Sequence, residues 1–579
     1  MTNQELANFI WGVADILRGD YKQSDYGKVI LPFTILRRID CVLEKSKDKV
    51  LAKYVTAKTM SEDGQDKILN KESGYNFHNH SKFDFPKLVA DPAHISMNMI
   101  NYVNGFSADA REITDKYKFE DTVVDLDNKD LLFLVTQEFS KIDLHPEKVS
   151  SMDMGYVFEE LIRKFAEASN ETAGEHFTPR EVIKLMVNIL FANDRDMLTT
   201  RGITKTLYDC ACGTGGMLSV AEEYIAELNP DARLELFGQE LNEESYAICK
   251  ADMMIKNQKS SNIKFGNSFT NDGLESKSFD YMLANPPFGV SWGKYAKKIK
   301  DEHGQHGFGG RFGAGLPRSN DGSFLLLMHM MSKMKQGKQG SRIAIVFNGS
   351  PLFTGSAGSG ESEIRKWIIE NDMLEAVIAM PDQLFYNTGI STYIWIVTNR
   401  KEPQRKGKVQ MINAVSFFKK MSRSLGSKRN EIGENDIIEI SRIYGDCEEG
   451  KYCKIFNNSD FGYSKVVVER PLLDKNDKPV TDKKGKPKPD TKLRDNENVA
   501  LKPGQLMSTE ADIQEYMKKE VLPHVPDAWV DHSKTKVGYE INMTKYFYEY
   551  KSLRPLVDID SDIMTLEKDM EGLLDEVMA

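Results

Sequence analysis

Between residues 175 and 415, short apolar runs alternate with segments of helical spacing, and this alternation restricts the chain to few folds. The runs are TLYD at 206–209, LELFG at 234–238, FDYMLA at 279–284, RIAIVF at 342–347, LEAVIAM at 374–380 and STYIWIVT at 391–398. Apolar runs of this length, separated by helices, are typical of a parallel sheet covered by helices on both faces. Because such sheets bind ligands at the carboxyl ends of their strands, the loops after the runs are the expected place for chemistry.

The segments on either side of this region predict two further domains. Residues 1 to about 170 carry apolar positions at helical spacing, including Phe9, Ile10, Val13, Ala14, Leu17, Ile35, Ile39 and Val42. We therefore expect an all-helical N-terminal domain at 1–170, an α/β domain at 171–420 and a mostly helical C-terminal region at 421–579. No internal repeat is apparent.

The C-terminal region contains two unusual segments. Residues 470–498 are rich in Lys, Asp and Pro, which indicates a solvated insertion. A DNA contact by its KKGKPK run is the less favoured alternative, since acidic residues flank that run. The chain ends in apolar residues spaced 4-3-4-3-4, which form a heptad seam: Ile559, Ile563, Leu566, Met570, Leu573 and Val577. From the spacing alone, this terminal helix is as well suited to packing on its own domain as to docking on a partner.

Composition excludes several classes of protein. With 77 Lys and Arg against 87 Asp and Glu, the formal charge of −10 excludes a histone-like polycation but not a local basic surface. No stretch approaches about 18 uncharged apolar residues, so we expect no membrane span. The N-terminus lacks the features of a signal peptide, and six cysteines are too few for a disulfide scaffold. A cytoplasmic protein is the expectation.

The first informative motif, DCACGTGG at 209–216, follows the run at 206–209. Gly213, Gly215 and Gly216 allow the backbone to approach a ligand closely, and the exposed amides favour a negative group. The next run ends in Glu240, which is well placed to accept hydrogen bonds from ribose hydroxyls. The pattern matches neither GxGxxG nor a phosphate-binding loop, so it indicates an adenosine-containing cofactor and argues against ATP hydrolysis. Zinc binding by the cysteines of this loop is not expected, because CxC has no second cluster.

The second motif, NPPF at 285–288, follows the run at 279–284. An exocyclic amino group of adenine is a poor nucleophile, because its lone pair is delocalised into the ring. The Asn285 side-chain oxygen and the Pro286 carbonyl can each accept one N–H bond and direct that lone pair toward an electrophilic methyl group, while Pro286 and Pro287 stiffen the loop. Phe288 can stack on a base that has left the helix. The simple alternative is a turn after a strand.

Together these motifs resemble those of the amino-methyltransferases, and specifically of the DNA adenine N6-methyltransferase (modification, M) subunit of type I restriction–modification systems. The resemblance covers nearly the whole chain. It rests on GEHFTPREVIKLM at 174–186, DCACGTGG at 209–216, FGQELN at 237–242, NPPF at 285–288, DGSFLLLMHMM at 321–331 and AVIAMPDQLFYNTGISTYIWIVTNR at 376–400. It implies a Rossmann-like, S-adenosylmethionine-dependent methyltransferase domain at 171–420 and a terminal helix that docks on a partner.

The resemblance also implies which residues bind S-adenosylmethionine. One group would embrace the cofactor from the side opposite the glycine loop: Glu175, His176, Phe177, Thr178, Pro179 and Arg180. A second would line the loop itself: Asp209, Ala211, Cys212, Gly213 and Gly215. Glu240 would bind the ribose, and Asn267 the amino group of the cofactor's adenine. Two positions depart from the family pattern, because Cys210 replaces a proline and Asn267 replaces an acid.

Residues 289–322 are the expected contact with double-stranded DNA. This segment holds nine glycines, six Lys or Arg and three acidic residues, so it should be flexible with a net charge of +3. Its candidate phosphate contacts are Lys294, Lys297, Lys298, Lys300, Arg311 and Arg318, and a merely solvated loop is the alternative. His303 and His306 have no further ligands nearby in the sequence, so no metal is expected.

No separate DNA-reading domain is visible, so a partner is expected to select the sequence. The family pattern implies a specificity (S) subunit, a second copy of the M subunit and, in the full complex, a restriction (R) subunit. Three alternatives stay open: a stand-alone adenine methyltransferase, a protein-glutamine or RNA amino-methyltransferase, and a degenerate methyltransferase kept for assembly.

Overall fold

The computed structural model describes residues 3–169, 178–192, 194, 199–337, 339–386, 388–548 and 554–578, with the backbone alone at 3–4, 152, 166–169, 569 and 571–578. The described chain divides into two compact units, Met1–Ile541 and Asn542–Ala579.

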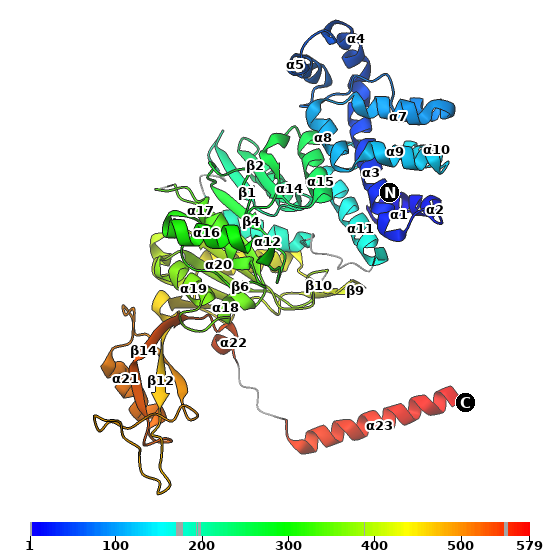
Figure 1. Ribbon diagram of the computed structural model, residues 1–579. Coiled ribbons are helices and arrows are strands. Elements are labelled where there is room, and N and C mark those ends of the chain that lie inside the picture. Colours follow the sequence, from blue (N-terminus) through cyan, green and yellow to red (C-terminus); the bar gives the residue numbers. More distant parts are fainter. Residues whose placement is uncertain are drawn as a thin grey trace. The chain divides into compact units, whose positions relative to one another are not determined.

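Residues 3–169 form helices joined by short loops and 3₁₀ turns (Figure 1), which confirms the predicted helical domain. The α-helices are α1 (Asn3–Trp11), α2 (Val13–Leu17), α3 (Tyr26–Leu43), α4 (Lys47–Ala57), α5 (Glu62–Ser73), α6 (Phe85–Val89), α7 (Ile95–Asn104), α8 (Ala108–Lys116), α9 (Phe119–Asn128), α10 (Leu132–Ser140) and α11 (Ser151–Ser169). The predicted apolar faces are buried in one core, except that Phe9 is exposed.

The α/β domain is built on one nine-stranded sheet, and each of the six apolar runs forms a strand. The strands are β1 (Thr204–Asp209), β2 (Arg233–Glu240), β3 (Ile263–Phe265), β4 (Tyr281–Ala284), β5 (Arg342–Phe347), β6 (Leu374–Ala379), β7 (Tyr393–Thr398), β8 (Lys408–Asn413) and β11 (Cys453–Asn457). Their order is β11-β8-β6-β7-β5-β4-β1-β2-β3. The sheet is mixed and not wholly parallel as expected. β7 runs antiparallel to β5 and β6, because the short loop after β6 lacks a crossover helix and returns the chain in the opposite direction.

Helices cover this sheet, and one of them also belongs to the helical domain. They are α12 (Arg180–Phe191), α14 (Gly216–Leu228), α15 (Glu243–Ile255), α16 (Ala296–His306), α17 (Ser323–Ser332), α18 (Ser350–Phe353), α19 (Gly360–Glu370) and α20 (Glu434–Asp446). On α15, Tyr246, Cys249 and Met253 pack into the core of the sheet, whereas Ile248 and Met254 pack into the core of the helical domain. The two cores therefore share α15.

The prediction of a mostly helical C-terminal region is wrong for the part that follows β11. A three-stranded antiparallel sheet lies there, with β12 (Gly462–Glu469) between β13 (Asp495–Ala500) and β14 (Trp529–Tyr539). The β-branched run Val466–Val468 favours a strand, and Val466 and Val468 pack against α21 (Glu510–Tyr516) and its continuation. A two-stranded hairpin, β9 (Lys419–Leu425) and β10 (Lys428–Glu431), precedes this sheet in the chain.

The insertion between β12 and β13 contains a repeat that the sequence analysis missed. Residues 470–477, 478–485 and 486–493 are octads with a basic residue first, proline second and aspartate fifth. The aspartate N–H of each octad donates to the carbonyl of the first residue of another octad, and the third octad returns to the first: Asp474 to Lys478, Asp482 to Lys486 and Asp490 to Arg470. The three octads thus close a ring of hydrogen bonds, and nearly all of their side chains are exposed, as expected for a solvated insertion.

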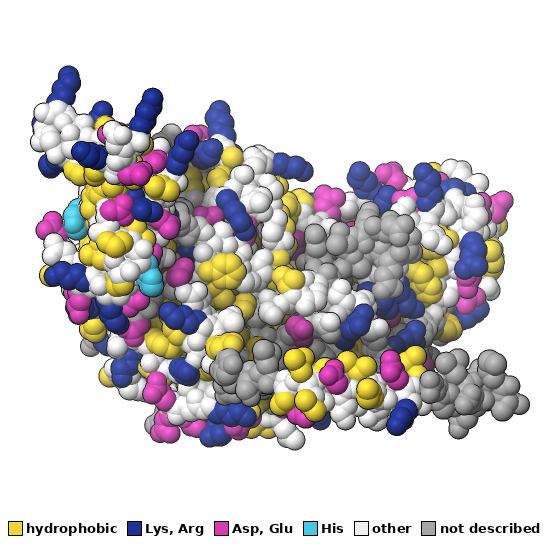
Figure 2. All heavy atoms as spheres, turned by 90° about the horizontal axis from the view of Figure 1, so that it is seen from below, with side chains coloured by type: hydrophobic (Ala, Val, Ile, Leu, Met, Phe, Trp, Pro, Cys, Tyr) yellow, Lys and Arg dark blue, Asp and Glu magenta, His cyan; other side chains and the backbone are white. Residues whose placement is uncertain are grey.

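The second unit contains α22 (Met543–Tyr546) and α23 (Leu556–Met578). The described part of the apolar seam of α23 is exposed, with Ile563 50% and Leu566 63% accessible, and Figure 2 shows hydrophobic side chains along this helix. No helix in the described ranges is long and apolar enough to cross a membrane.

Candidate functional site

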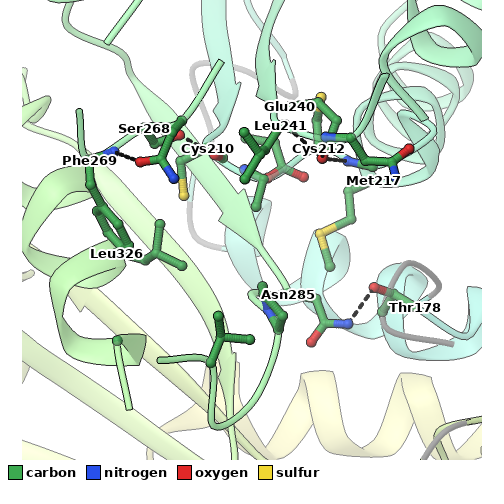
Figure 3. Close-up of a pocket in the computed structure, with 18 of the residues that line it drawn as sticks. Thr178, Cys210, Cys212, Met217, Glu240, Leu241, Ser268, Phe269, Asn285 and Leu326 are labelled. Atoms are coloured by element: carbon green, nitrogen blue, oxygen red, sulfur yellow. Dashed lines mark hydrogen bonds between the residues drawn. The ribbon is translucent and has the colours of Figure 1, made fainter. Parts of the chain in front are cut away.

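A cavity of about 710 Å³ opens at the carboxyl ends of β1, β2 and β4 (Figure 3). Ten of the predicted site residues line it: Thr178, Asp209, Ala211, Cys212, Gly213, Glu240, Asn267, Asn285, Pro287 and Lys294. Both motifs singled out in the sequence therefore meet at one site, as their position after neighbouring strands predicts.

The glycine loop after β1 is fastened to the end of β2 by Glu240. One carboxylate oxygen accepts the Gly213 N–H at 2.8 Å, and the other accepts the N–H groups of Leu241 and Asn242 at 2.8 and 2.7 Å. Gly215 has a φ of +87°, and a Cβ there would lie 2.8 Å from Cys249 Sγ, so only glycine fits this turn. Gly215 shapes the loop but does not line the cavity.

Asp209 closes the base of the loop. It is buried and accepts the Ala211 N–H at 3.0 Å. Burial, with a smaller contribution from the nearby Glu240, raises the pKa of this carboxyl to about 7, although the Ala211 N–H opposes the shift. The loop therefore places two carboxylates beside the cavity, one of them poised to titrate near neutral pH.

The opposite wall is formed by Asn267, Ser268 and Phe269, and its contacts differ from those predicted. Asn267 Oδ1 accepts the N–H groups of Phe269 and Thr270 at 2.8 and 3.2 Å. The oxygen predicted to accept from the cofactor's adenine is thus already used to close a turn. Asn267 still lines the cavity, so its place in the site agrees with the prediction while its hydrogen bonds do not.

Arg311 supports this wall from behind. Its guanidinium donates to the carbonyls of Ser268 and Phe269, both at 2.8 Å, and pairs with Glu302 at 2.6 Å. With its donors used inside the protein, Arg311 has contacts that indicate a structural role instead of the predicted phosphate contact. Ser268 and Phe269 are about 40 residues from Arg311 in the chain, so no local sequence pattern could predict this role.

Asn285 follows β4, lines the cavity and has an unused acceptor. Its Nδ2 donates to Thr178 Oγ1 at 2.9 Å, as Figure 3 shows. Its Oδ1 is buried and accepts no hydrogen bond from the described residues. A buried acceptor without a donor is costly in a folded protein, and such atoms are characteristic of sites that a ligand completes.

The other residues of the NPPF motif occupy different positions. Pro287 lines the cavity, whereas Pro286 is buried behind it. The Phe288 ring is half-buried and packs edge-on against Phe385 at 6.1 Å between centroids, so it is adjacent to the cavity without forming its wall.

The segment before α12 is described only in part. Glu175, His176 and Phe177 lie outside the described residues. Thr178 lines the cavity, Pro179 precedes α12, and Arg180 begins that helix and pairs with Glu159 at 3.7 Å. Glu159, on α11, also lines the cavity. It was not predicted, since it lies on an amphipathic helix outside any recognised motif.

Four of the predicted phosphate contacts lie in α16 or just before it, a helix where the glycine content predicted a flexible loop. Lys297, Lys298 and Lys300 are exposed, and Lys294 is exposed at the mouth of the cavity. Arg318 is half-exposed and donates to Ser350 Oγ at 3.0 Å.

Within the described ranges, no group of three or more His, Cys, Asp or Glu side chains is placed to hold a metal ion. Cys212 and Cys249 lie with their sulfurs 3.9 Å apart, and both are free thiols. The neighbouring Cys249 thiol and burial raise the pKa of Cys212, which keeps it protonated.

The chain matches two known protein families. Residues 150–473, more than half of the chain and including both motifs, match the family described as N-6 DNA Methylase. The chain belongs to this N-6 DNA methylase family. Residues 6–139 match a second family, the HsdM N-terminal domain, which covers most of the helical domain. The resemblance to type I modification subunits is thereby confirmed.

Curated relatives of this N-6 DNA methylase are named as methylase subunits of type I restriction enzymes. The type I restriction enzyme MjaIX methylase subunit of Methanocaldococcus jannaschii is 28% identical over 479 residues, which cover 80% of this chain and 81% of the relative. The type I restriction enzyme HindI methylase subunit of Haemophilus influenzae is 30% identical over 264 residues, which cover 45% of this chain and 54% of the relative.

Solved structures show the same fold. The methyltransferase subunit of a type I restriction–modification system from Streptococcus thermophilus superposes with a TM-score of 0.61 at 24% identity, over 80% of this chain and 97% of that one. A second structure, solved to describe complex assembly and conformational transition of the type I R-M system, superposes with a TM-score of 0.51 at 17% identity. The match covers 100% of this chain and 98% of that one.

Proposed function

We propose that this chain is the modification subunit of a type I restriction–modification system and methylates the N6 amino group of adenine in DNA, with S-adenosylmethionine as the methyl donor. The observation that carries this proposal is the buried, unused Oδ1 of Asn285, a residue that lines the same cavity as the glycine loop and Glu240. Family membership and the relatives named above support the same conclusion.

The cavity suits an adenosine-containing cofactor. Glu240 lies at the end of the strand next to the glycine loop, which is where sheets of this kind bind a ribose. Two glycines allow the close packing of the loop and of the neighbouring strand β2. A Cβ at Gly215 in the loop would lie 2.8 Å from a cysteine sulfur, and one at Gly238 in β2 would lie 2.9 Å from another. Asp209, Ala211 and Gly213 would hold the cofactor from the loop, and Thr178 from the other side.

The chemistry follows from the position of Asn285. When bound, S-adenosylmethionine supplies an electrophilic methyl group. Asn285 Oδ1 accepts one hydrogen of the adenine amino group, and the Pro286 carbonyl is the second acceptor that we propose. Together they draw the nitrogen lone pair out of the ring and orient it for attack. The methyl group that the cofactor would supply takes the place of one proton of this amino group, and that proton would leave to solvent.

Access to adenine in duplex DNA requires that the base leave the helix. We propose that Phe288 stacks on the displaced base, since its ring is half-buried next to the cavity mouth. The exposed Lys297, Lys298 and Lys300 supply phosphate contacts nearby. A specificity subunit selects the DNA sequence, with the apolar seam of α23 as a docking element. A second copy of this chain and a restriction subunit complete the assembly.

The test is transfer of labelled methyl from S-adenosylmethionine to adenine in DNA, by the chain alone and with a co-expressed specificity subunit. Activity that requires both proteins supports the proposal. Sequence-specific activity of the chain alone would contradict the assigned division of labour. Transfer only to a protein or RNA substrate would contradict the DNA assignment.

A further inference from the structure

Glu159 brings a negative charge into the cavity from outside the sheet. It lies on α11, whose residues Met154, Val157 and Leu161 are part of the core of the helical domain. Its side chain lines the cavity near Thr178, Gly216 and Met217. A Cβ at Gly216 would lie 3.4 Å from Glu159 Oε1, so the carboxylate lies against the first turn of α14.

Among the residues that the structure describes, the charge of this carboxylate is poorly compensated. Its side chain is only 12% exposed, and its ion pair with Arg180 Nη2 is 3.7 Å long. That separation exceeds the limit of about 3.2 Å for a typical N–H···O bond. Burial raises the pKa of Glu159 to about 7, against the opposing effect of Arg180 and with a small contribution from Glu181. A buried acid in this state gains from a cationic ligand.

The layout of the cavity indicates which part of a cofactor reaches Glu159. Glu240 marks the ribose position beside the glycine loop, and Asn285 marks the point of methyl transfer (Figure 3). Glu159 lies beyond that loop, at the first turn of α14, where Gly216 and Met217 line the cavity. In S-adenosylmethionine the amino acid end extends from the sulfur away from the adenosine, and its α-ammonium is the one cationic hydrogen-bond donor there.

We infer that Glu159 is the residue that binds the α-ammonium of the cofactor's amino acid end, and that α11 of the helical domain thereby completes the cofactor site. This inference rests on the proposed function. The alternative is structural: Glu159 complements the N-terminus of α14 and pairs with Arg180 without touching the ligand.

Two ligands separate these explanations by equilibrium binding. S-adenosylhomocysteine contains the α-ammonium, whereas 5′-methylthioadenosine keeps the adenine, ribose and thioether but lacks the amino acid end. Loss of one charge-assisted contact corresponds to a weakening of about 10- to 100-fold. We therefore expect Glu159→Gln to weaken S-adenosylhomocysteine binding by about that factor and to leave 5′-methylthioadenosine binding within about twofold of wild type.

Glu160→Gln is the matched control. Glu160 is the next residue of α11, is buried, pairs with Arg163 at 2.7 Å and does not line the cavity. It should not change the ratio of the two affinities. Equal weakening of both ligands by Glu159→Gln, or no weakening of either, would overturn the inference and leave the proposed function intact. If the wild type bound neither ligand, the proposed cofactor itself would be wrong.

Discussion

The side-chain amide of Asn285 is oriented by Thr178, whose hydroxyl oxygen accepts the Nδ2–H at 2.9 Å. Because the donor end of the amide is used by Thr178, its acceptor end, Oδ1, is the end that has no hydrogen bond from the described residues. Thr178 comes from the segment before α12 and Asn285 from the end of β4. Their contact joins the cofactor side of the site to its reacting side.

Removing the Thr178 hydroxyl should therefore impair orientation. Thr178→Val keeps the shape of the side chain but leaves the Asn285 amide free to rotate, so we expect kcat to fall about 10-fold, from the loss of one hydrogen bond. Thr178→Ser retains the hydroxyl and should keep most of the rate. Steady-state methylation kinetics measure both. A Val variant with unchanged kcat would contradict the orienting role.

Asn285 itself should affect chemistry much more than binding. Asn285→Ala removes an acceptor used in the transition state, and we expect kcat to fall at least about 100-fold. Cofactor affinity, measured by calorimetry, should stay within about threefold, because Glu240 and the glycine loop are untouched. Asn285→Asp keeps an acceptor but loses the N–H that Thr178 accepts, so its rate should be intermediate. Normal turnover by the Ala variant would refute the mechanism.

We expect Arg311 to affect stability and the exposed lysines of α16 to affect DNA binding. Arg311→Ala leaves Glu302 and two carbonyls without their partner, so we expect lower thermal stability, by about 2–3 kcal/mol, and weaker cofactor binding.

The matched change is the double variant Lys297→Ala, Lys300→Ala. It should leave stability unchanged but lower the slope of log Kd for DNA against log salt by about 2, since each phosphate contact contributes roughly 0.9. The reverse pattern would mean that Arg311, and not the helix, contacts phosphate.

Asp209 should make stability depend on pH. Its pKa in the folded protein, about 7, is above its ordinary value of 3.8, so the stabilising form is the neutral one. That stability is fully present below pH 3.8 and is lost as pH rises through about 7. Asp209→Asn lacks the titration. We expect the Tm of the wild type to fall relative to this variant between pH 5 and pH 7.5, measured by scanning calorimetry. A constant difference would show that Asp209 stays ionised.

The seam of α23 should govern assembly and not folding. Leu566 is 63% exposed, so Leu566→Glu should cost little stability in the free chain but prevent co-purification with a specificity subunit. Thr565→Glu places the same charge one residue away, off the seam, and should still assemble. Equal binding by both variants would assign docking to another surface.

Sequence patterns predicted the catalytic sheet well because each strand and its loop carry a local signal. The six apolar runs, the glycine loop, Glu240 and NPPF all lie where strand ends converge, and their positions follow from topology alone. Glu159 and Arg311 act through contacts with segments far along the chain, so no local pattern marked them. The use of Asn267 in a turn was equally hidden, because the choice of partner for its oxygen depends on the fold of the loop.

The C-terminal error has a different cause. The strong helical periodicity at 559–577 predicts a helix there but does not represent the whole region. The valines at 466–468 and the octads, each with a proline in second position, favour extended backbone. The octad repeat was missed because only three positions in eight recur, and charge dominates the rest.

The ring of octads also limits how this part of the protein can change. In an open stack of repeats, each unit bonds only to its neighbours, so the stack can gain or lose a unit and keep its pattern. Here the last aspartate bonds back to the first octad, through Asp490 and Arg470. Adding or deleting a single octad would leave donors and acceptors unmatched. Homologues that retain this ring should therefore have three octads, and variation in length should occur in the turns between them.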